Sequence, residues 1–253
     1  MKDIMIFRRV EKKYLLTPEQ KDALLSLISP HLTPDVHGRN TICSLYLDTP
    51  DHLIIRNSII ARTYKEKLRL RSYGTPGMED LVFLEIKKKF KGVVYKRRER
   101  MPLQQAMAYI EQGVKPCDSQ IMREIDYAMH FYHQPQPAML IAYDREAYFD
   151  EANPNLRITF DTNIRYRDKD CHLEHGSEGT RLLPEDVILM EIKTDGAMPV
   201  WLAKALSTCS IRPSRFSKYA NAYLISAGLS PAFVPAPVNQ SVTNVRGEFV
   251  THA

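Results

Sequence analysis

Charged side chains recur at every second position across residues 65–100, and this pattern constrains the fold more than any other feature of the chain. Lys67, Arg69 and Arg71 alternate with glutamate and leucines. A period of two is the period of a β-strand, whose successive side chains point to opposite faces. The stretch therefore predicts two or three strands that share one packed face and one strongly cationic face.

The same alternation returns in predicted strands at both ends of the chain. The charged positions are Arg9, Glu11, Lys13, Lys67, Arg69, Arg71, Glu85, Lys87, Lys89, Lys96, Arg98, Arg145, Arg157, Asp161, Glu191 and Lys193. If one face of these strands points inward, the side chains line a single cavity. Enclosed cations are poorly solvated without an anion, so the pattern indicates a phosphate polyanion, with the carboxylates holding a divalent metal. Periodicity alone leaves open a solvated basic face with weak surface ion pairs.

The composition is that of a globular protein. With 253 residues, 44% of them hydrophobic and 26% charged, the chain is long enough to bury a core. Its net charge of +5 is too small for a protein that coats nucleic acid, so we expect no nucleic-acid partner. The four scattered cysteines form no disulfide framework, and no apolar run is long enough to span a membrane. We therefore expect a cytoplasmic protein that does not itself insert into a membrane.

Predicted strands are interrupted by helices throughout the chain. Outside residues 65–100 the predicted strands are Met5–Leu16, Asn40–Asp48, Ala138–Phe149, Leu156–Asp161, Asn163–Arg167 and Val187–Lys193. The predicted helices are Glu19–Ser29, a short one that ends at Asn57, Leu103–Gln112, Ser119–His133, Pro199–Ser207 and Arg215–Ala227. This order argues against a parallel βαβ sheet. It predicts an α+β fold, with an antiparallel sheet or a closed barrel of about eight strands and helices packed outside, over residues 1–228. The proline-containing residues 229–253 are expected to be a disordered tail.

Several short motifs resemble one known family. They are E-x-K-Y at Glu11–Tyr14, K-x-R-x-R at Lys67–Arg71, E-x-K at Glu85–Lys87 and Glu191–Lys193, Y-x-R at Tyr143–Arg145 and R-F-S-K-Y at Arg215–Tyr219. In this order, from about Phe7 to Ile225, they resemble the triphosphate tunnel metalloenzymes of the CYTH-like superfamily. The resemblance is closest to the VTC domain, the polyphosphate polymerase domain, in its bacterial form. It implies an antiparallel eight-stranded β-barrel tunnel, with helices packed outside, that binds triphosphate or a polyphosphate chain.

The resemblance also implies roles for individual residues. The catalytic set would be Lys13, Arg69, Arg71, Lys87, Glu191 and Lys193. Further phosphate contacts would come from Lys67, Lys96, Arg98, Arg145, Arg157, Arg215 and Lys218, with Arg56 as a looser candidate. The metal, Mn²⁺ or Mg²⁺, would lie on Glu191, with Glu85 and Glu11 contributing.

Two positions depart from the family pattern. Tunnel hydrolases carry E-x-E-x-K on the first strand, and here Arg9 replaces the first glutamate. The change removes a carboxylate and adds a cation, which favours the polymerase branch. Arg215 stands where the family usually has lysine, and the charge is kept.

The expected activity is metal-dependent phosphoryl transfer, with polyphosphate synthesis from the γ-phosphate of ATP as the first hypothesis. A module that binds or senses polyphosphate without turnover is one alternative, and a triphosphate hydrolase is another. The expected partners are ATP and polyphosphate or triphosphate, and a membrane partner is possible. A metal clip at Cys171–His175 is a weaker interpretation than a solvated loop, because the chain has no matching second cluster.

Overall fold

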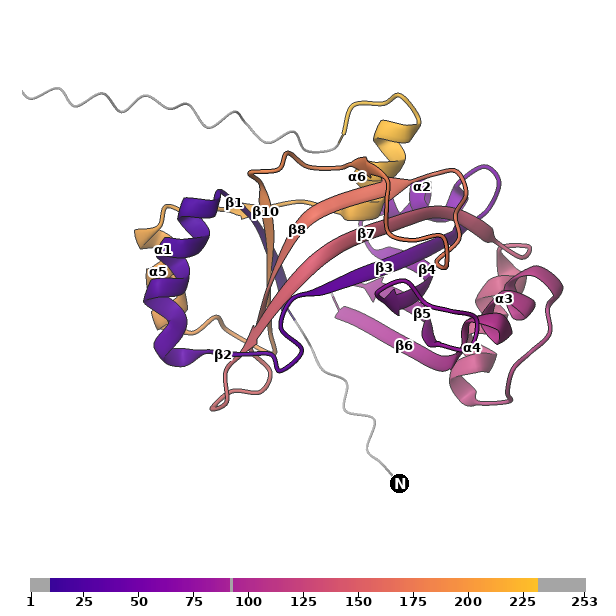
Figure 1. The fold of residues 1–253 in the computed structure, drawn as a ribbon, viewed down its shortest axis with the longest axis horizontal. Coiled ribbons are helices and arrows are strands. Elements are labelled where there is room, and N and C mark those ends of the chain that lie inside the picture. The colour runs from indigo at the N-terminus through magenta and orange to yellow at the C-terminus, as the bar shows by residue number, and fades with distance from the viewer. Residues whose placement is uncertain (1–9, 92, 232–253) are drawn as a thin grey trace, which may run out of the picture.

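One curved antiparallel sheet forms the centre of the molecule, and helices surround it (Figure 1). The computed structural model describes residues 10–91 and 93–231. The strands are β1 (Val10–Leu16), β2 (Thr33–Pro34), β3 (Asn40–Asp48), β4 (Tyr64–Tyr73), β5 (Leu81–Phe90), β6 (Val93–Pro102), β7 (Gln136–Phe149), β8 (Arg157–Arg167), β9 (Thr180–Arg181), β10 (Ile188–Thr194) and β11 (Pro213–Ser214). The helices are α1 (Pro18–Ile28), α2 (Leu53–Ile60), α3 (Leu103–Gln112), α4 (Gln120–Phe131), α5 (Val200–Thr208) and α6 (Lys218–Ser226), with a 3₁₀ turn at Ser29–His31.

The sheet is antiparallel throughout but is not closed. Its strand order is β11-β1-β10-β8-β7-β3-β4-β5-β6, with β2 paired to β7 and β9 paired to β8. The α+β antiparallel prediction is confirmed, but the closed eight-stranded barrel is not, because the sheet has 11 strands and no ladder joins β6 to β1 or β11 within residues 10–91 and 93–231. Pro213 contributes to the open edge, since proline has no N–H to donate to a ladder.

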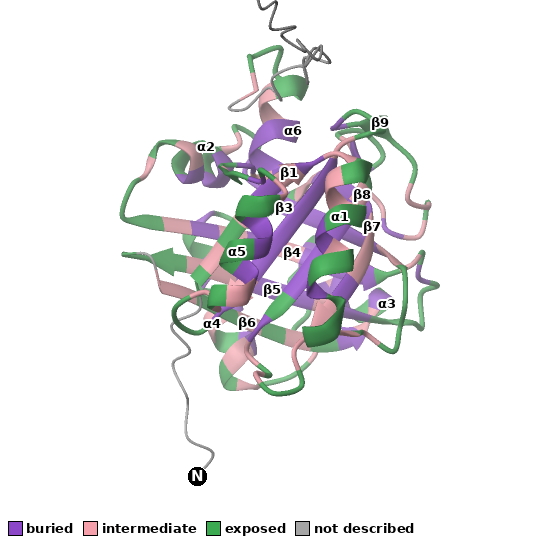
Figure 2. Cartoon of the chain, turned by 90° about the vertical axis from the view of Figure 1, so that its left-hand side faces the viewer, coloured by how far each residue is buried: buried purple, intermediate pink, exposed green. Residues whose placement is uncertain are grey.

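Alternating side chains on the outer face pack against two separate helix layers. Leu68, Leu70 and Ile86 on β4 and β5 belong to one apolar cluster with residues of α3 and α4. Phe160 and Met190 on β8 and β10 belong to a second cluster with residues of α1 and α5. Figure 2 shows the result, with buried residues along the sheet and exposed residues on the outer sides of α1 and α5. Packing of the outer set leaves the opposite set of alternating residues on the inner face.

Helices α2 and α6 cover one end of the inner face, and one buried carboxylate, that of Asp48, is bonded to both. Asp48, at the end of β3, accepts backbone N–H groups of Thr49 (2.9 Å), Ile54 (2.8 Å) and Ile55 (3.0 Å), so it caps the start of α2. The hydroxyl of Tyr219 on α6 donates to the same carboxylate at 2.7 Å. Asp48 therefore fixes both helices against the sheet.

The remaining element boundaries differ little from the predictions, with two informative exceptions. Helix α6 begins at Lys218, because the Oγ of Ser217 caps it by accepting the Ala220 N–H at 3.3 Å, so Arg215 precedes the helix. The two predicted strands at 156–167 form one strand, β8, which bends at Asn163 (φ 48°). The predicted strand at residues 5–9 and the predicted tail beyond residue 231 lie outside the described residues. Among the described helices, none is both long and apolar enough to cross a membrane.

Replacing the buried carboxylate that holds α2 and α6 should destabilise the fold. We expect Asp48→Ala to lower the free energy of unfolding by about 3 kcal/mol, because buried N–H and O–H donors lose a charged acceptor. Urea denaturation measures the change. The matched control is Asp22→Ala on the exposed side of α1, which should change the same quantity by no more than about 0.5 kcal/mol. Equal losses in both variants would contradict the role of Asp48.

Candidate functional site

The charged residues predicted from alternation share the inner face of the sheet. Cross-strand partners point to the same face, and the register pairs Lys13 with Glu191, Arg69 with Glu85, and Lys67 with Lys87. Following the register through all strands gives one inner set: Glu11, Lys13, Lys67, Arg69, Arg71, Glu85, Lys87, Lys96, Arg98, Arg145, Arg157, Asp161, Glu191 and Lys193. Cations in this set far outnumber carboxylates, so the inner face is a strongly electropositive surface.

Glu191 is the most heavily paired carboxylate of the inner face. Its oxygens lie 3.3 Å from the Nζ of Lys13, 3.3 Å from Lys218, 3.7 Å from Lys193 and 3.4 Å from the Arg145 guanidinium. Burial acts to raise the pKa of Glu191, but the four cations outweigh it and hold the pKa well below its usual range. Glu191 is therefore an ionised carboxylate at neutral pH.

Carboxylates on either side extend this cluster. Lys13 also lies 3.6 Å from Glu11, whose other oxygen is 3.4 Å from the Nζ of Lys87 on β5. On the other side, Arg145 forms a bidentate pair with Asp161 at 2.6 and 2.7 Å. The Lys87–Glu11 contact joins β5 to β1, strands that are far apart in the sheet order. The sheet thus curves until its two halves meet through side chains.

A second cluster surrounds Glu85 on the wall formed by β4, β5 and β6. Its carboxylate lies 2.7 Å from Nε of Arg69, 3.9 Å from Arg71 and 2.5 Å from Nζ of Lys96. Burial acts to raise the pKa of Glu85, but these cations lower it to about 2. Arg69 also donates to the hydroxyl of Tyr46 at 3.2 Å. Both arginines are therefore held in place before any ligand binds.

Three lysines of the inner face have lowered pKa values and would become more fully protonated beside a bound anion. Burial lowers the pKa of Lys67, Lys96 and Lys193 to about 8, more than their carboxylate and tyrosine neighbours raise it. Lys67 donates to the Oγ of Ser217 at 3.1 Å and has no carboxylate partner among the described residues. A phosphate beside these ammonium groups would restore their full charge.

Some predicted phosphate ligands lie apart from these clusters. Arg157 shares the inner face, but its half-exposed guanidinium pairs with Asp35 at 3.0 Å. Arg98 is exposed and lies over the ring of Phe83, 4.8 Å from its centroid. Arg215 is exposed ahead of α6, and the looser candidate Arg56, on α2, pairs with Asp51 at 3.2 Å. The structure thus brings together the sequence-predicted residues of β1, β4, β5, β7 and β10 with Lys96 of β6 and Lys218 of α6.

Two polar residues that complete the site, Asp161 and Tyr46, received no individual role from the sequence. Asp161 was visible in the alternation, but its pairing with Arg145 and Lys218 depends on the fold. Tyr46 lies in β3, where it shares a face with Ser44 and Asp48; that period of two was the available signal. Burial acts to raise the pKa of Tyr46, yet Arg69, Lys67 and Arg71 lower it to about 7. These residues add acceptors for the surplus of cations.

The oxygen donors of the Glu191 cluster fit a hard divalent cation that shares its ligands with phosphate. The described residues contain no group of three acidic, histidine or cysteine side chains arranged to hold a metal alone. Mg²⁺, however, is usually bound by one or two carboxylates together with substrate phosphates and water. Next to Glu191 in register lie Thr159 and, beyond Lys13, Ser214. The hydroxyls of both are buried and have no hydrogen-bond partner within residues 10–91 and 93–231, so each has hydrogen-bonding capacity left for such a ligand.

The model of the VTC domain matches residues 8–227, most of the chain. The chain therefore belongs to the VTC domain family. None of the curated proteins is similar enough in sequence to match the chain.

Two solved structures share the fold. A candidate adenylate cyclase from Bacillus halodurans is 14% identical, with a TM-score of 0.52 over 83% of this chain and 95% of that one. A candidate adenylyl cyclase from Hippeastrum, described as having a dominant triphosphatase activity, is 14% identical, with a TM-score of 0.51 over 90% and 98% of the two chains. At these identities the likeness shows a shared fold only.

Anion binding to the inner face should weaken as the lysines lose their protons. Because a phosphate binds the ammonium form, affinity for tripolyphosphate is full below pH 8 and falls as the pH rises through about 8. Between pH 7 and pH 9 we expect a loss of roughly tenfold or more in metal-free isothermal titration calorimetry.

The matched control is the double variant Lys67→Arg and Lys193→Arg, in which arginine keeps its charge across this range. Its affinity should change much less with pH, and ionisation of the ligand itself is common to both proteins. The same pH dependence in both proteins would show that these lysines are not phosphate ligands.

Proposed function

We propose that the protein transfers phosphoryl groups on the inner face of its sheet, and that it synthesises polyphosphate from the γ-phosphate of ATP with Mn²⁺ or Mg²⁺. The observation that carries the proposal is the ionised Glu191, buried among Lys13, Lys193, Lys218 and Arg145. A polyanion fits the surplus of cations, and the carboxylate at their centre would supply an oxygen ligand to a divalent metal that neutralises phosphate charge. Membership of the VTC domain family supports the same substrate class.

The Glu85 cluster and the Glu191 cluster would bind phosphates in different ways. Arg69 and Arg71, held by Glu85, would grip phosphate oxygens through their guanidinium forks. Lys13, Lys87 and Lys193 would meet the phosphates near Glu191 as point charges. Lys67, Lys96, Arg145 and Lys218 extend the contacts along the inner face, with Arg98, Arg157 and Arg215 at its exposed margins. The phosphate chain would thus lie along the sheet between the two walls.

The reaction needs no covalent nucleophile from the protein. An oxygen of the terminal phosphate of the acceptor chain attacks the γ-phosphorus of ATP, the bond to the bridging β–γ oxygen breaks, and ADP leaves. The side chains align the two phosphates and neutralise the charge that develops on the transferred group. Glu191, with Glu11 as its neighbour and Glu85 on the facing wall, would hold the metal, which when bound supplies further charge neutralisation.

Carboxylates in the cavity favour catalysis over simple binding. A module that only binds or senses polyphosphate gains nothing from Glu191 and Glu85, because each reduces the positive charge that attracts the ligand. Hydrolysis with water as acceptor would use the same residues. The arginine at position 9, in place of a hydrolase glutamate, favours the polymerase.

Glu191→Gln should abolish turnover of ATP in the presence of Mn²⁺, because the change removes the charge that organises four cations and the metal. Phosphorus-31 NMR follows the products: internal chain resonances identify the polymerase, and orthophosphate alone identifies the hydrolase. We expect chain resonances in the wild type and a loss of rate of at least about 10³-fold in the variant.

The control is Glu185→Gln, a neighbouring substitution at a side chain that is 88% exposed and should leave the rate unchanged. Turnover that survives in Glu191→Gln would refute the metal assignment. Tight binding of polyphosphate with no turnover of ATP in the wild type would identify the binding module instead.

A further inference from the structure

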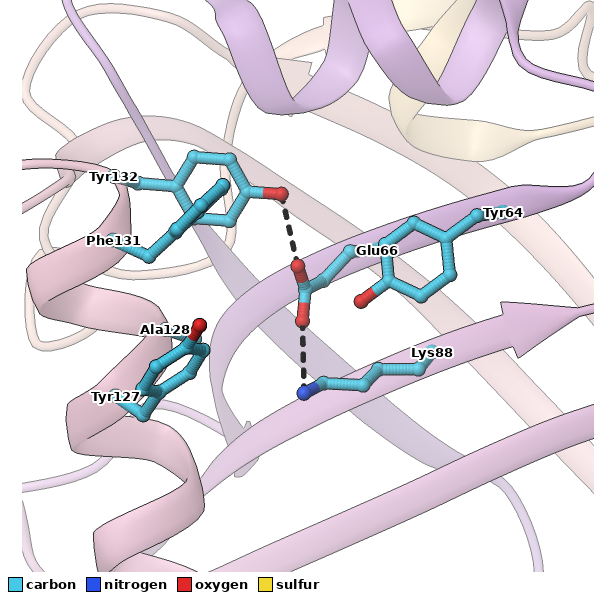
Figure 3. A pocket seen from close by; sticks show the side chains of 7 residues that line it. All are labelled: Tyr64, Glu66, Lys88, Tyr127, Ala128, Phe131 and Tyr132. Atoms are coloured by element: carbon cyan, nitrogen blue, oxygen red, sulfur yellow. Dashed lines mark hydrogen bonds and ion pairs between the residues drawn. The ribbon is translucent and has the colours of Figure 1, made fainter.

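A small pocket lies on the outer face of the sheet, away from the inner charged face. It is formed between β4, β5 and α4, has a volume of about 180 Å³, and is lined by Tyr64, Glu66, Lys88, Tyr127, Ala128, Phe131 and Tyr132 (Figure 3). At about 30 Å³ per molecule, this volume corresponds to roughly six waters. The pocket is too small for a nucleotide and suits a compact ligand. Its chemistry is independent of the proposed phosphoryl transfer.

The walls of the pocket are aromatic and open to solvent. On α4, Tyr127 and Phe131 are one turn apart and stack with centroids 6.3 Å apart, and they are 69% and 62% exposed. Across from them, Tyr64 on β4 is 41% exposed. Figure 3 shows these rings around the carboxylate of Glu66. Large aromatic side chains gathered at a solvent-exposed cavity indicate a binding site more often than isolated surface residues do.

The floor of the pocket is a buried carboxylate, one oxygen of which is held only by an ion pair with Lys88. Glu66 is only 7% exposed, and its Oε2 accepts the hydroxyl of Tyr132 at 2.9 Å. Its Oε1 is buried and accepts no hydrogen bond from the described residues. The Nζ of Lys88, its cross-strand partner, approaches this oxygen to 3.3 Å as an ion pair. An anionic acceptor is therefore aimed into an aromatic pocket.

The phenols beside this carboxylate stay protonated. Burial and the charge of Glu66 raise the pKa of Tyr64 to about 12, and they raise the pKa of Tyr132 as well. The rings therefore remain neutral and keep the electron-rich faces that attract cations. Neither hydroxyl adds a negative charge that would draw in a metal ion.

We propose that this pocket binds a compact organic ammonium group, with its charge on Glu66 and its alkyl groups against the rings of Tyr64, Tyr127 and Phe131. Aromatic faces and a carboxylate together recognise a cation that also has apolar surface. In the unliganded protein the ammonium group of Lys88 pairs with the carboxylate of Glu66. This ammonium is at the rim, on a flexible stem with the side chain 32% exposed, so it can return to water when the ligand enters. Because one ammonium group replaces another beside Glu66, the net charge at the carboxylate does not change.

Choline and its neutral isostere 3,3-dimethylbutan-1-ol test the proposal, because they differ in charge and hardly in shape. In titrations followed by NMR we expect choline to bind at least tenfold more tightly than the alcohol. Glu66→Gln should remove this preference, and Tyr127→Leu should weaken choline binding about three- to fivefold. Lys88→Met, which removes the competing ammonium, should strengthen it. Tyr73→Leu, at an exposed aromatic outside the pocket, is the matched control and should change nothing.

Equal binding of choline and the alcohol, or a Glu66→Gln variant that keeps the preference, would overturn the proposal. So would the absence of choline binding in both the wild type and Lys88→Met, with circular dichroism showing that both are folded. Sedimentation with phosphatidylcholine vesicles distinguishes whether the ammonium group that binds belongs to a lipid headgroup or to a free amine. Sedimentation that Glu66→Gln prevents identifies a lipid headgroup, and choline binding without sedimentation identifies a free amine.

Discussion

The buried negative charge of Glu191 is the interaction on which the inner face depends. Lys13, Lys193, Lys218 and Arg145 approach it from β1, β10, α6 and β7. A carboxylate this deeply buried is tolerated only when cations pair with it, and those cations would repel one another without it. One side chain therefore holds together three strands and the C-terminal helix. A bound phosphate would take over part of this role, which couples ligand binding to the order of the site.

The two walls of the inner face are organised in different ways. Around Glu191 most cations are lysines, whose flexible stems can follow a phosphate as it moves. Around Glu85 two of the three partners are arginines, with Lys96 as the third. Arg69 is held by Glu85 and Tyr46, and Arg71 by Glu85 and Ser44. The rigid wall suits a phosphate that must be kept in place, and the flexible wall suits one that changes position.

Much of this arrangement could be predicted from alternation alone. The period of two at Lys67–Arg71 and Glu191–Lys193 predicted strands and their inner faces, because the pleat of a strand allows only two directions for its side chains. The order of strands and helices predicted the antiparallel α+β class. The same argument could not predict closure, which depends on whether two distant edges pair. The predicted helix at Arg215–Ala227 began too early, because the cap at Ser217 starts α6 at Lys218. The aromatic pocket was missed because its residues come from two strands and a helix that are far apart in sequence.

By itself, the sequence determined which residues share a face and that this face is cationic, since both follow from local backbone geometry and residue type. Only the tertiary structure decided which charges meet. The contact of Lys87 with Glu11 requires the sheet to curve, and the contact of Lys218 with Asp161 requires α6 to lie across its inner face. Such pairs join residues far apart in the chain, and their energy depends on burial, which no local pattern contains. The cationic face was therefore predictable, whereas its two carboxylate-centred clusters were not.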